Sequence, residues 1–278
     1  MKAEYVRTIV QLALTEDIGD GDITTDNLIP QPSRSKARLI AQAPGIICGL
    51  SVAREVFKTL NPRIVFRTLV EDGQKVRPGQ VIAIISGPTR ILLTGERVAL
   101  NFLTHLSGIA TTTRTYVQAV KPYKTAIMDT RKTTPLLRQL ERYAVRQGGG
   151  VNHRFNLNDM VMIKDNHRVF CLPGIPEAVG RLKLKTRAAI EVEVDNFDQL
   201  KEALRSTADI ILLDNMTPAK AAQAVKIARR AKSRALLEAS GGITPENIKR
   251  YAATGVDRIS IGALTHSPRI LDISMELE

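Results

Sequence analysis

The sequence has few of the residues that mark extracellular, membrane-spanning or base-stacking proteins. It contains two Cys, no Trp, and only five Tyr and six Phe among 278 residues. Cys48 and Cys171 lack the spacing of metal ligands, and a single intracellular pair is more often reduced than bridged. Residues 1–19 lack the order of a signal peptide, and no run of about 18 apolar residues is present. We therefore expect a cytoplasmic protein that does not associate with a membrane.

A strong positive charge points to an anionic partner. Lys and Arg number 40 against 28 Asp and Glu, which gives a formal net charge of +12. This balance favours nucleic acid, an anionic membrane or a polyanionic small molecule. The scarcity of aromatics and the absence of an RNP-like or zinc-finger pattern disfavour a base-stacking platform. We expect a small polyanion and no nucleic acid, and keep a basic RNA-binding module as the alternative outside enzymes.

The first part of the chain combines short strands with few helices. Apolar residues at helical spacing predict an amphipathic helix over 2–15. Short β-type runs separated by Pro-Gly and Asp-Gly pairs predict the next elements: strands at 37–41, 64–70 and 81–85, and helices at 51–60 and 91–119. Clustered strands of this kind indicate an α+β unit.

An acidic, glycine-rich loop at 16–25 follows the first helix. A Ca²⁺ loop is one interpretation, but no Glu closes the frame of an EF-hand. A turn that caps and connects helices is therefore the favoured interpretation.

From residue 120 the pattern becomes one apolar run followed by one helix, repeated. Strands are predicted at 125–128, 160–163, 189–194, 209–213, 235–239 and 258–261. Helices are predicted at 135–147, 176–184, 197–204, 218–231 and 245–253. This alternation indicates a parallel sheet that is buried on both faces, and a β/α barrel with six recognisable strands fits it best.

Polar and charged residues directly follow these predicted strands, where the active site of a β/α barrel lies. They are Asp129 to Lys132, Lys164 and Asp165, Glu193 and Asp195, Asp214 and Asn215, Ser240 to Gly242, and Gly262 with Ala263. On one rim they would form a bowl with cations on one side and carboxylates on the other. Residues with a purely structural role would be scattered over both ends of the barrel, so the pattern predicts a site.

The last two loops of the barrel suit a phosphate group. The glycines of the 240–242 loop let the backbone approach a ligand, and Thr244 and Pro245 are expected to cap and begin the next helix. The free amides of such a helix attract anions. The loop at 262–266 follows the next strand, and β/α barrels often hold phosphate between their final two loops.

The cationic side of the bowl is predicted from Arg131, Lys132, His153, Arg154 and Lys164. Arginine can bind a carboxylate or a phosphate through two parallel hydrogen bonds. The bowl should therefore accept a ligand with more than one anionic group.

Other charged residues have more than one interpretation. Glu193 and Asp214 could bind Mg²⁺ together with phosphates, stabilise a positive transition state, or serve as salt-bridge partners. By pattern alone, Arg97 is a solvated helix charge and His105 is a core or interface histidine.

The helix at 135–147 also carries charge. We assign its buried stripe to Leu136, Leu137, Leu140, Tyr143 and Ala144. Three arginines, at 138, 142 and 146, are then expected on its solvated face.

A series of motifs runs over most of the chain. These are EDIGDGDITT (16–25), LLTGERVALNFLTHLSGIAT (92–111), DTRKTTP (129–135), YAVRQGGGVNHR (143–154), MIKDNH (162–167), IEVEVDN (190–196), LLDNM (212–216), EASGGI (238–243) and GVDRISIGALTHS (255–267). Together they resemble the quinolinate phosphoribosyltransferase family, also called carboxylating nicotinate-nucleotide pyrophosphorylases. The order and specificity of the motifs make the resemblance strong.

The resemblance implies a reaction and an architecture. Quinolinate and phosphoribosyl pyrophosphate would react with Mg²⁺ to give nicotinate mononucleotide, pyrophosphate and CO₂ in NAD biosynthesis. The fold class would be α/β, with an incomplete, six- or seven-stranded β/α barrel at 111–266 and an α+β open sandwich formed by 1–110 and about 267–278. The protein would be a homodimer with shared active sites, and a larger assembly stays open.

The resemblance also implies roles for particular residues. Lys132, Glu193 and Asp214 would be catalytic, and the two carboxylates would be the Mg²⁺ ligands. Quinolinate and other anionic groups would be bound by Thr130, Arg131, His153, Arg154 and Lys164, with Arg97 from the partner subunit. Phosphate would be bound by Ser240, Gly241, Gly242, Ile261, Gly262, Ala263 and His266. For Arg97 this replaces the interpretation as a solvated charge.

Two places depart from the family pattern, and other enzymes remain in competition. Leu136 stands where Gly is common, and 169–174 replaces a loop that is usually small and rich in Ala and Gly. A related barrel could act on nicotinate without decarboxylation, as could the molybdenum-linked paralogues on another base. A Schiff-base lyase could use Lys132 or Lys164.

Overall fold

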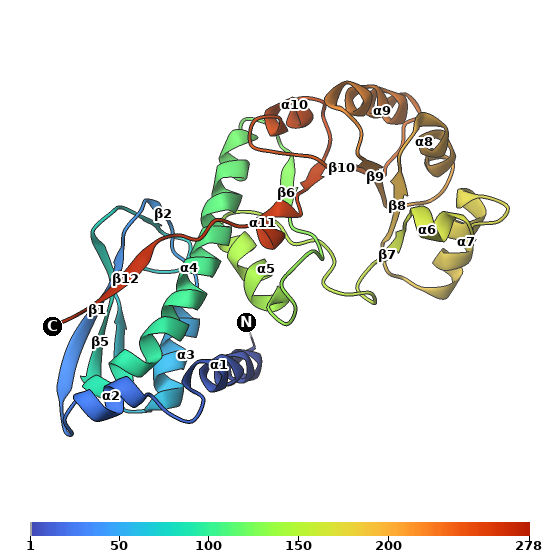
Figure 1. Ribbon diagram of the computed structural model, residues 1–278. Coiled ribbons are helices and arrows are strands. Elements are labelled where there is room, and N and C mark those ends of the chain that lie inside the picture. Colours follow the sequence, from blue (N-terminus) through green and yellow to red (C-terminus); the bar gives the residue numbers. More distant parts are fainter. Residues whose placement is uncertain (1) are drawn as a thin grey trace. The chain divides into compact units, whose positions relative to one another are not determined.

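The computed structural model describes residues 2–278, which form two compact units (Figure 1). Unit 1 comprises the described residues up to Arg114, together with 133–149 and 263–278. Unit 2 comprises 115–132 and 150–262. The segment 133–149, which our predicted domain boundaries assigned to the barrel, therefore makes its contacts within unit 1.

Unit 1 contains an antiparallel sheet in the order β12-β1-β5-β3 and a short sheet of β2 and β4. Its strands are β1 (Arg34–Ala41), β2 (Gly45–Ile46), β3 (Val65–Thr68), β4 (Lys75–Val76), β5 (Gln80–Pro88) and β12 (Ile273–Leu277). Its helices are α1 (Ala3–Ile18), α2 (Ile23–Leu28), α3 (Leu50–Leu60), α5 (Arg138–Gln147) and α11 (Ala263–His266). Helix α4 (Thr89–Ala119) begins in unit 1 and continues into unit 2.

Hydrophobic periodicity explains the main elements of unit 1. The apolar residues Val6, Ile9, Val10 and Leu14 recur at helical spacing on α1, and all four are buried. The acidic loop at 16–25 supplies a cap, as expected of a capping turn. The Asp22 carboxylate accepts the Thr25 backbone N–H at 2.9 Å and so begins α2.

Unit 2 is built on a six-stranded parallel sheet in the order β6-β11-β10-β9-β8-β7. The strands are β6 (Ala126–Met128), β7 (Val161–Ile163), β8 (Ile190–Val194), β9 (Ile210–Asp214), β10 (Leu236–Ser240) and β11 (Arg258–Ser260). The helices are α6 (Asp165–Arg168), α7 (Ile175–Lys185), α8 (Phe197–Leu204), α9 (Pro218–Arg230) and α10 (Ile248–Ala252). Figure 1 shows α8, α9 and α10 along the outer side of this sheet.

The sheet of unit 2 confirms the predicted incomplete β/α barrel. All six predicted strands are present, and the central strands are the most buried, as shown by Ile190, Val192 and Val194 of β8. Strands β6 and β7 are the two edges of the sheet, and among residues 2–278 no strand joins one edge to the other. The antiparallel sheet of unit 1 confirms the predicted α+β companion.

The predicted faces of the 135–147 helix were partly wrong. Leu136 lies before the helix, has a φ of 66° and is 73% exposed, whereas Arg142 is buried. A positive φ strains any residue with a Cβ, so the structure gives a reason why glycine suits position 136. Packing within unit 1, rather than the local pattern, decides that Arg142 is covered.

The predicted start of the 245–253 helix was also wrong. Helix α10 begins at Ile248, and Asn247 occupies the N-cap position in place of Thr244. The backbone first makes a turn, in which the Asn247 N–H donates to the Thr244 carbonyl at 3.2 Å. The helix that follows is short, which removes our argument that its dipole binds phosphate.

None of the helices found in residues 2–278 combines the length and apolar character that crossing a membrane requires.

Two glycine substitutions test the packing of the two units. At Gly108 of α4, an added Cβ would overlap the Arg269 carbonyl oxygen, whereas at Gly180 of α7 it would meet open space. Gly108→Ala should lower the free energy of unfolding by about 1–3 kcal/mol through overpacking. Gly180→Ala should raise it by up to about 1 kcal/mol through helix propensity. Urea denaturation of both variants would measure this, and unchanged stability of Gly108→Ala would contradict the packing described.

Candidate active site at the carboxyl edge of the parallel sheet

The parallel register aligns the carboxyl ends of the strands of unit 2. Asp214 pairs with Ser240, Ser240 pairs with Ser260, and Ser260 pairs with Met128. The loops that leave these positions therefore emerge along one edge of the sheet. That edge carries the chemical groups of the candidate site.

Asp129 joins two of these loops. It follows β6 and is fully buried. Its carboxylate accepts the His153 backbone N–H at 2.7 Å and the Asn152 side-chain amide at 2.5 Å. A bridge between Met128 and Val151 continues the same pairing. The loop at 150–154 is thereby fixed against the end of β6, because an ionised acceptor makes strong hydrogen bonds.

Two guanidinium groups lie close to each other at this edge. Arg154 donates from Nη1 to the Met160 carbonyl at 3.1 Å and is only partly exposed. Burial lowers the pKa of Arg154, and the neighbouring charge of Arg131 lowers it further. Like charges held together repel, so an anion placed between them would be stabilised. Carboxylate or phosphate oxygens fit the donor geometry of two arginines.

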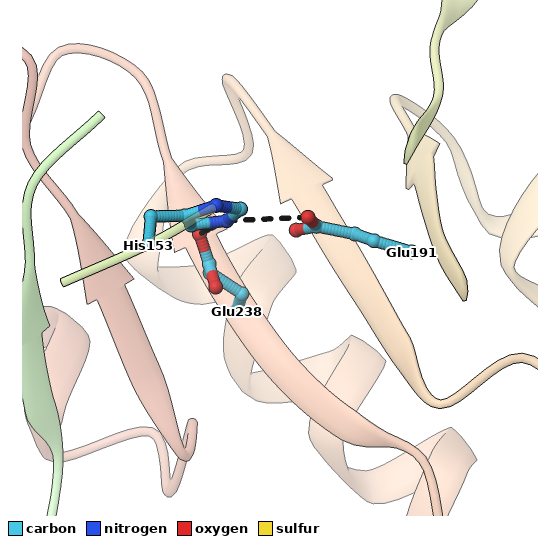
Figure 2. A group of neighbouring side chains, drawn as sticks. All are labelled: His153, Glu191 and Glu238. Carbon is cyan, nitrogen blue, oxygen red and sulfur yellow. Dashed lines mark ion pairs between the residues drawn. The ribbon is translucent and has the colours of Figure 1, made fainter. Parts of the chain in front are cut away.

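Below the edge, one imidazole lies between two buried carboxylates (Figure 2). The His153 side chain is 7% exposed, and those of Glu191 and Glu238 are 0% exposed. The His153 Nε2 atom lies 3.2 Å from Glu191 Oε2 and 3.3 Å from Glu238 Oε1. Glu191 belongs to β8 and Glu238 to β10, so side chains from two strands of the sheet contact one imidazole ring.

The hydrogen bonds of His153 fix its tautomer. Its Nδ1 accepts the Arg154 backbone N–H at 2.8 Å, so Nδ1 holds a lone pair and the ring proton lies on Nε2. Burial lowers the pKa of His153, but Glu191 and Glu238 outweigh this effect and raise it to about 10. An imidazolium would nevertheless turn an Nδ1–H toward the amide N–H. The geometry therefore favours a neutral ring.

The ionised form of Glu191 is disfavoured in this cluster. Burial raises the pKa of Glu191, and the charge of Glu238 raises it further. Two adjacent buried carboxylates cannot both ionise without a large desolvation and repulsion penalty.

A second pair of carboxylates lies at the carboxyl edge itself. Burial raises the pKa of Glu193, which the nearby Lys164 lowers and the charge of Asp214 raises again. Lys164 Nζ is 3.8 Å from Glu193 Oε2. Asp214 Oδ2 accepts the Asn215 side-chain amide at 2.7 Å. Two carboxylates that repel each other, with oxygen donors only, suit a hard divalent cation such as Mg²⁺.

The 240–242 loop after β10 has the left-handed backbone that its two glycines suggest. Gly241 and Gly242 have φ values of 95° and 61°. A Cβ at Gly241 would overlap Asn215 Oδ1, so glycine is required there for close approach. Gly242 faces open space and is exposed. The backbone of this loop can therefore approach a ligand, and this does not depend on helix α10.

The predicted site residues divide between the two units. Those of unit 2 are Thr130, Arg131, Lys132, His153, Arg154, Lys164, Glu193, Asp214, Ser240, Gly241, Gly242, Ile261 and Gly262. Those of unit 1 are Arg97, Ala263 and His266. Arg97 is exposed on α4, and His266 is exposed at the end of α11. Ile261 is buried, and its backbone N–H donates to the Met128 carbonyl at 3.0 Å.

Sequence reasoning missed the acidic residues beneath the edge. Glu191 and Glu238 each stand between two apolar residues of a strand, in IEVEV and in LLEAS. A charged residue inside a buried strand is costly unless it is paired, and this is the signal that could have identified them. Asp129 was recognised as following a strand, but its role in holding the 150–154 loop was not.

Two family models match the chain in succession. Quinolinate phosphoribosyl transferase, N-terminal domain, matches residues 22–107, and the C-terminal domain of the same description matches residues 109–276. A probable nicotinate-nucleotide pyrophosphorylase (carboxylating) from Synechocystis sp. is 47% identical over 271 residues, or 96% of this chain and 91% of the relative. The nicotinate-nucleotide pyrophosphorylase (carboxylating) of Mycobacterium leprae is 43% identical over 99% of this chain and 98% of its own.

Solved structures give the same result. The nicotinate-nucleotide pyrophosphorylase from Francisella tularensis has a TM-score of 0.94 and 40% identity, covering 100% of this chain and 98% of the other. The corresponding protein from Ehrlichia chaffeensis has a TM-score of 0.93 and 36% identity, covering 100% and 99%.

Replacing Asp129 tests whether it holds the 150–154 loop. Asp129→Ala should lower the free energy of unfolding by about 2–4 kcal/mol, because two partly buried donors lose a buried charged acceptor. Asp198 provides a matched control, since its side chain is 93% exposed, and Asp198→Ala should change stability by no more than about 0.5 kcal/mol. Thermal unfolding would compare the two variants. Equal, small effects would show that the Asp129 hydrogen bonds contribute little.

Proposed function

The chain belongs to the quinolinate phosphoribosyl transferase family, and from this premise we propose that it is the decarboxylating enzyme of that name. It transfers the phosphoribosyl group of phosphoribosyl pyrophosphate to quinolinate. The products are nicotinate mononucleotide, pyrophosphate and CO₂, and the reaction belongs to NAD biosynthesis. The observation that carries this proposal is the pair of guanidiniums, Arg131 and Arg154, at the carboxyl edge of the barrel in a chain that both family models match.

Quinolinate suits the cationic side of the site because it carries two carboxylates on one ring. Arg131 and Arg154 would bind these carboxylates through paired hydrogen bonds. Lys164 would contribute a further positive charge, and its ion pair with Glu193 links the two sides of the site. Thr130, which accepts the Lys132 backbone N–H at 3.1 Å, would hold the turn between Asp129 and Lys132.

The transfer step needs no nucleophile from the protein, since the ring nitrogen of quinolinate attacks the ribose carbon that bears pyrophosphate. That carbon gains positive character as the bond to pyrophosphate breaks. Glu193 and Asp214 would stabilise it electrostatically. Lys132 is exposed and belongs, with Arg131 and Arg154, to the cationic side of the site. This supports a catalytic role toward the pyrophosphate leaving group.

Mg²⁺ fits the oxygen donors of Glu193 and Asp214. The ion would supply charge neutralisation of the pyrophosphate group when bound. The glycine loop at Ser240 to Gly242 would receive the phosphate of the ribose, together with Ile261, Gly262, Ala263 and His266. The left-handed backbone of Gly241 and Gly242 supports this role.

Decarboxylation follows from the same electrostatics. After transfer the ring nitrogen is positive, and the carboxylate beside it leaves as CO₂. The electron pair of the broken bond stays on the ring carbon next to the positive nitrogen, and this carbon then takes up one proton. Cations that bind the departing carboxylate must not stabilise the ground state as strongly as the transition state.

A Schiff-base mechanism receives little support from the site. Such a lysine is usually desolvated or placed beside another cation. Lys132 is exposed, and the side chain of Lys164 is 45% exposed and paired with Glu193.

The assembly and location of the enzyme are part of the proposal. The exposure of Arg97 on α4 supports a homodimer in which this residue enters the partner's site, and a larger assembly is compatible with the same contact. Free thiols at Cys48 and Cys171 support a cytoplasmic location.

Turnover with defined substrates tests the reaction. The purified protein with quinolinate, phosphoribosyl pyrophosphate and Mg²⁺ should release CO₂ and pyrophosphate in equal amounts, and chelation of Mg²⁺ should stop both. Nicotinate, which lacks the second carboxylate, should be a poor substrate and a weak competitor. Absence of both products over a range of pH and divalent metals would sink the proposal, and efficient turnover of nicotinate without CO₂ would assign the related reaction instead.

Mixing two inactive variants tests the shared site. Arg97→Ala and Arg131→Ala should each lose activity, because each removes a cation from every site. If subunits exchange freely, half of the dimers become hybrids with one intact site of two, so activity should recover to about a quarter of wild type. Exchange would be verified with differently tagged subunits. No recovery despite exchange would place Arg97 in the site of its own chain.

A further inference from the structure

The two fully buried glutamates of the barrel interior have no part in the reaction proposed above. Burying a carboxylate costs several kcal/mol unless a partner compensates it. Glu191 and Glu238 lie against the same atom, the Nε2 of His153, at 3.2 and 3.3 Å (Figure 2). Well-packed apolar residues in both positions would be at least as good for stability. The cost of this cluster therefore points to a role in the site.

A metal ion is the first alternative to consider. One ligand atom from each of His153, Glu191 and Glu238 lies within 4.8 Å of the others. A histidine that binds metal through Nε2 offers the lone pair of that atom and usually donates Nδ1–H to another group. Here Nδ1 is the acceptor, at 2.8 Å from the Arg154 backbone nitrogen. The proton therefore lies on Nε2, which leaves it a donor to the carboxylates and no metal ligand.

The same contacts engage all three nitrogen atoms of His153 within the protein. Its backbone N–H is bound by Asp129, its Nδ1 by Arg154, and its Nε2 by the two glutamates. Each of these contacts restrains a different part of the residue. Asp129 fixes the backbone, and the glutamates fix the plane and tautomer of the ring.

Through Nδ1, the ring then restrains the backbone of Arg154. A neutral ring of the other tautomer would present Nδ1–H to the Arg154 N–H, which would push the two apart. Arg154 is one of the two guanidiniums to which we assign quinolinate, and the Met160 carbonyl accepts a hydrogen bond from its Nη1. A shift of about 1 Å in such a group can change a rate by two orders of magnitude.

We propose that Glu191 and Glu238 are positioning residues that hold His153 as its Nε2–H tautomer, and that His153 in turn positions Arg154 to bind quinolinate. The inference rests on the proposed function for the identity of the ligand. It changes the role of His153 from a substrate ligand to a support for Arg154.

Substitution of Glu238 tests this chain of contacts. Glu238→Ala removes an acceptor from Nε2–H and should raise the Kd for quinolinate about 10- to 100-fold, the effect typical of losing a group that orients a ligand. The Kd for phosphoribosyl pyrophosphate should stay within about threefold. Glu238→Gln retains a carbonyl oxygen that can accept the same proton, and should recover most of the affinity for quinolinate. Calorimetry with each substrate separately would give these values.

A matched control distinguishes positioning from the general loss of a buried glutamate. Glu141 of unit 1 is also 0% exposed and lies 2.9 Å from the Nε2 of a different histidine, His105. Glu141→Ala should lower stability and leave the Kd for quinolinate within about threefold among folded molecules. Equal loss of both substrates in Glu238→Ala, no benefit of Gln over Ala, or a parallel loss in Glu141→Ala would each overturn the proposal.

A readout without substrate separates this inference from the proposed function. Nitrogen-15 NMR of labelled histidine, with the signal assigned by a His153→Asn variant, should show the Nε2–H tautomer in the wild type and in Glu238→Gln, and its loss in Glu238→Ala. An imidazolium or the Nδ1–H tautomer in the wild type would overturn the inference, as would a stoichiometric metal that disappears with Glu238. Failure to turn over quinolinate would sink the proposed function alone and would leave the tautomer result standing.

Discussion

Burying two carboxylates in the interior of a barrel is costly, and in this protein both lie against a single imidazole. Glu191 and Glu238 come from strands β8 and β10, and His153 comes from a loop that Asp129 ties to the end of β6. Because the desolvation penalty is large if any partner moves away, these segments are held in one arrangement. The 150–154 loop, which carries Arg154, is therefore held in place as well.

In unit 2, acidic and basic side chains occupy different places near the carboxyl end of the parallel sheet. The acidic cluster lies beneath the carboxyl edge, Arg131 and Arg154 are neighbours at the edge, and Glu193 and Asp214 form a separate acidic pair there. A substrate with two carboxylates needs cationic side chains. A substrate with pyrophosphate needs a metal ion, and carboxylate oxygens hold such an ion. The parallel register supplies both from neighbouring strand ends.

Most of the fold could be predicted from the periodic spacing of apolar residues along the sequence. The six strands and their intervening helices repeat a pattern long enough to be recognised, and α1, α3 and α4 show clear helical spacing. Short elements such as α6, α11 and β12 have too few residues to show any period. The buried Arg142 and the exposed Leu136 were misjudged because packing within unit 1 decides which face is covered.

The sequence by itself determined which residue types follow each strand, and hence the cationic and acidic groups of the candidate site. It also placed glycines where the backbone must adopt a positive φ, as at Gly241. Only the tertiary structure decided which of these groups meet. The two glutamates stand far apart along the chain, and each is flanked by apolar residues in its own strand. Parallel pairing in three dimensions brings both onto the ring of His153, and no local pattern encodes that contact.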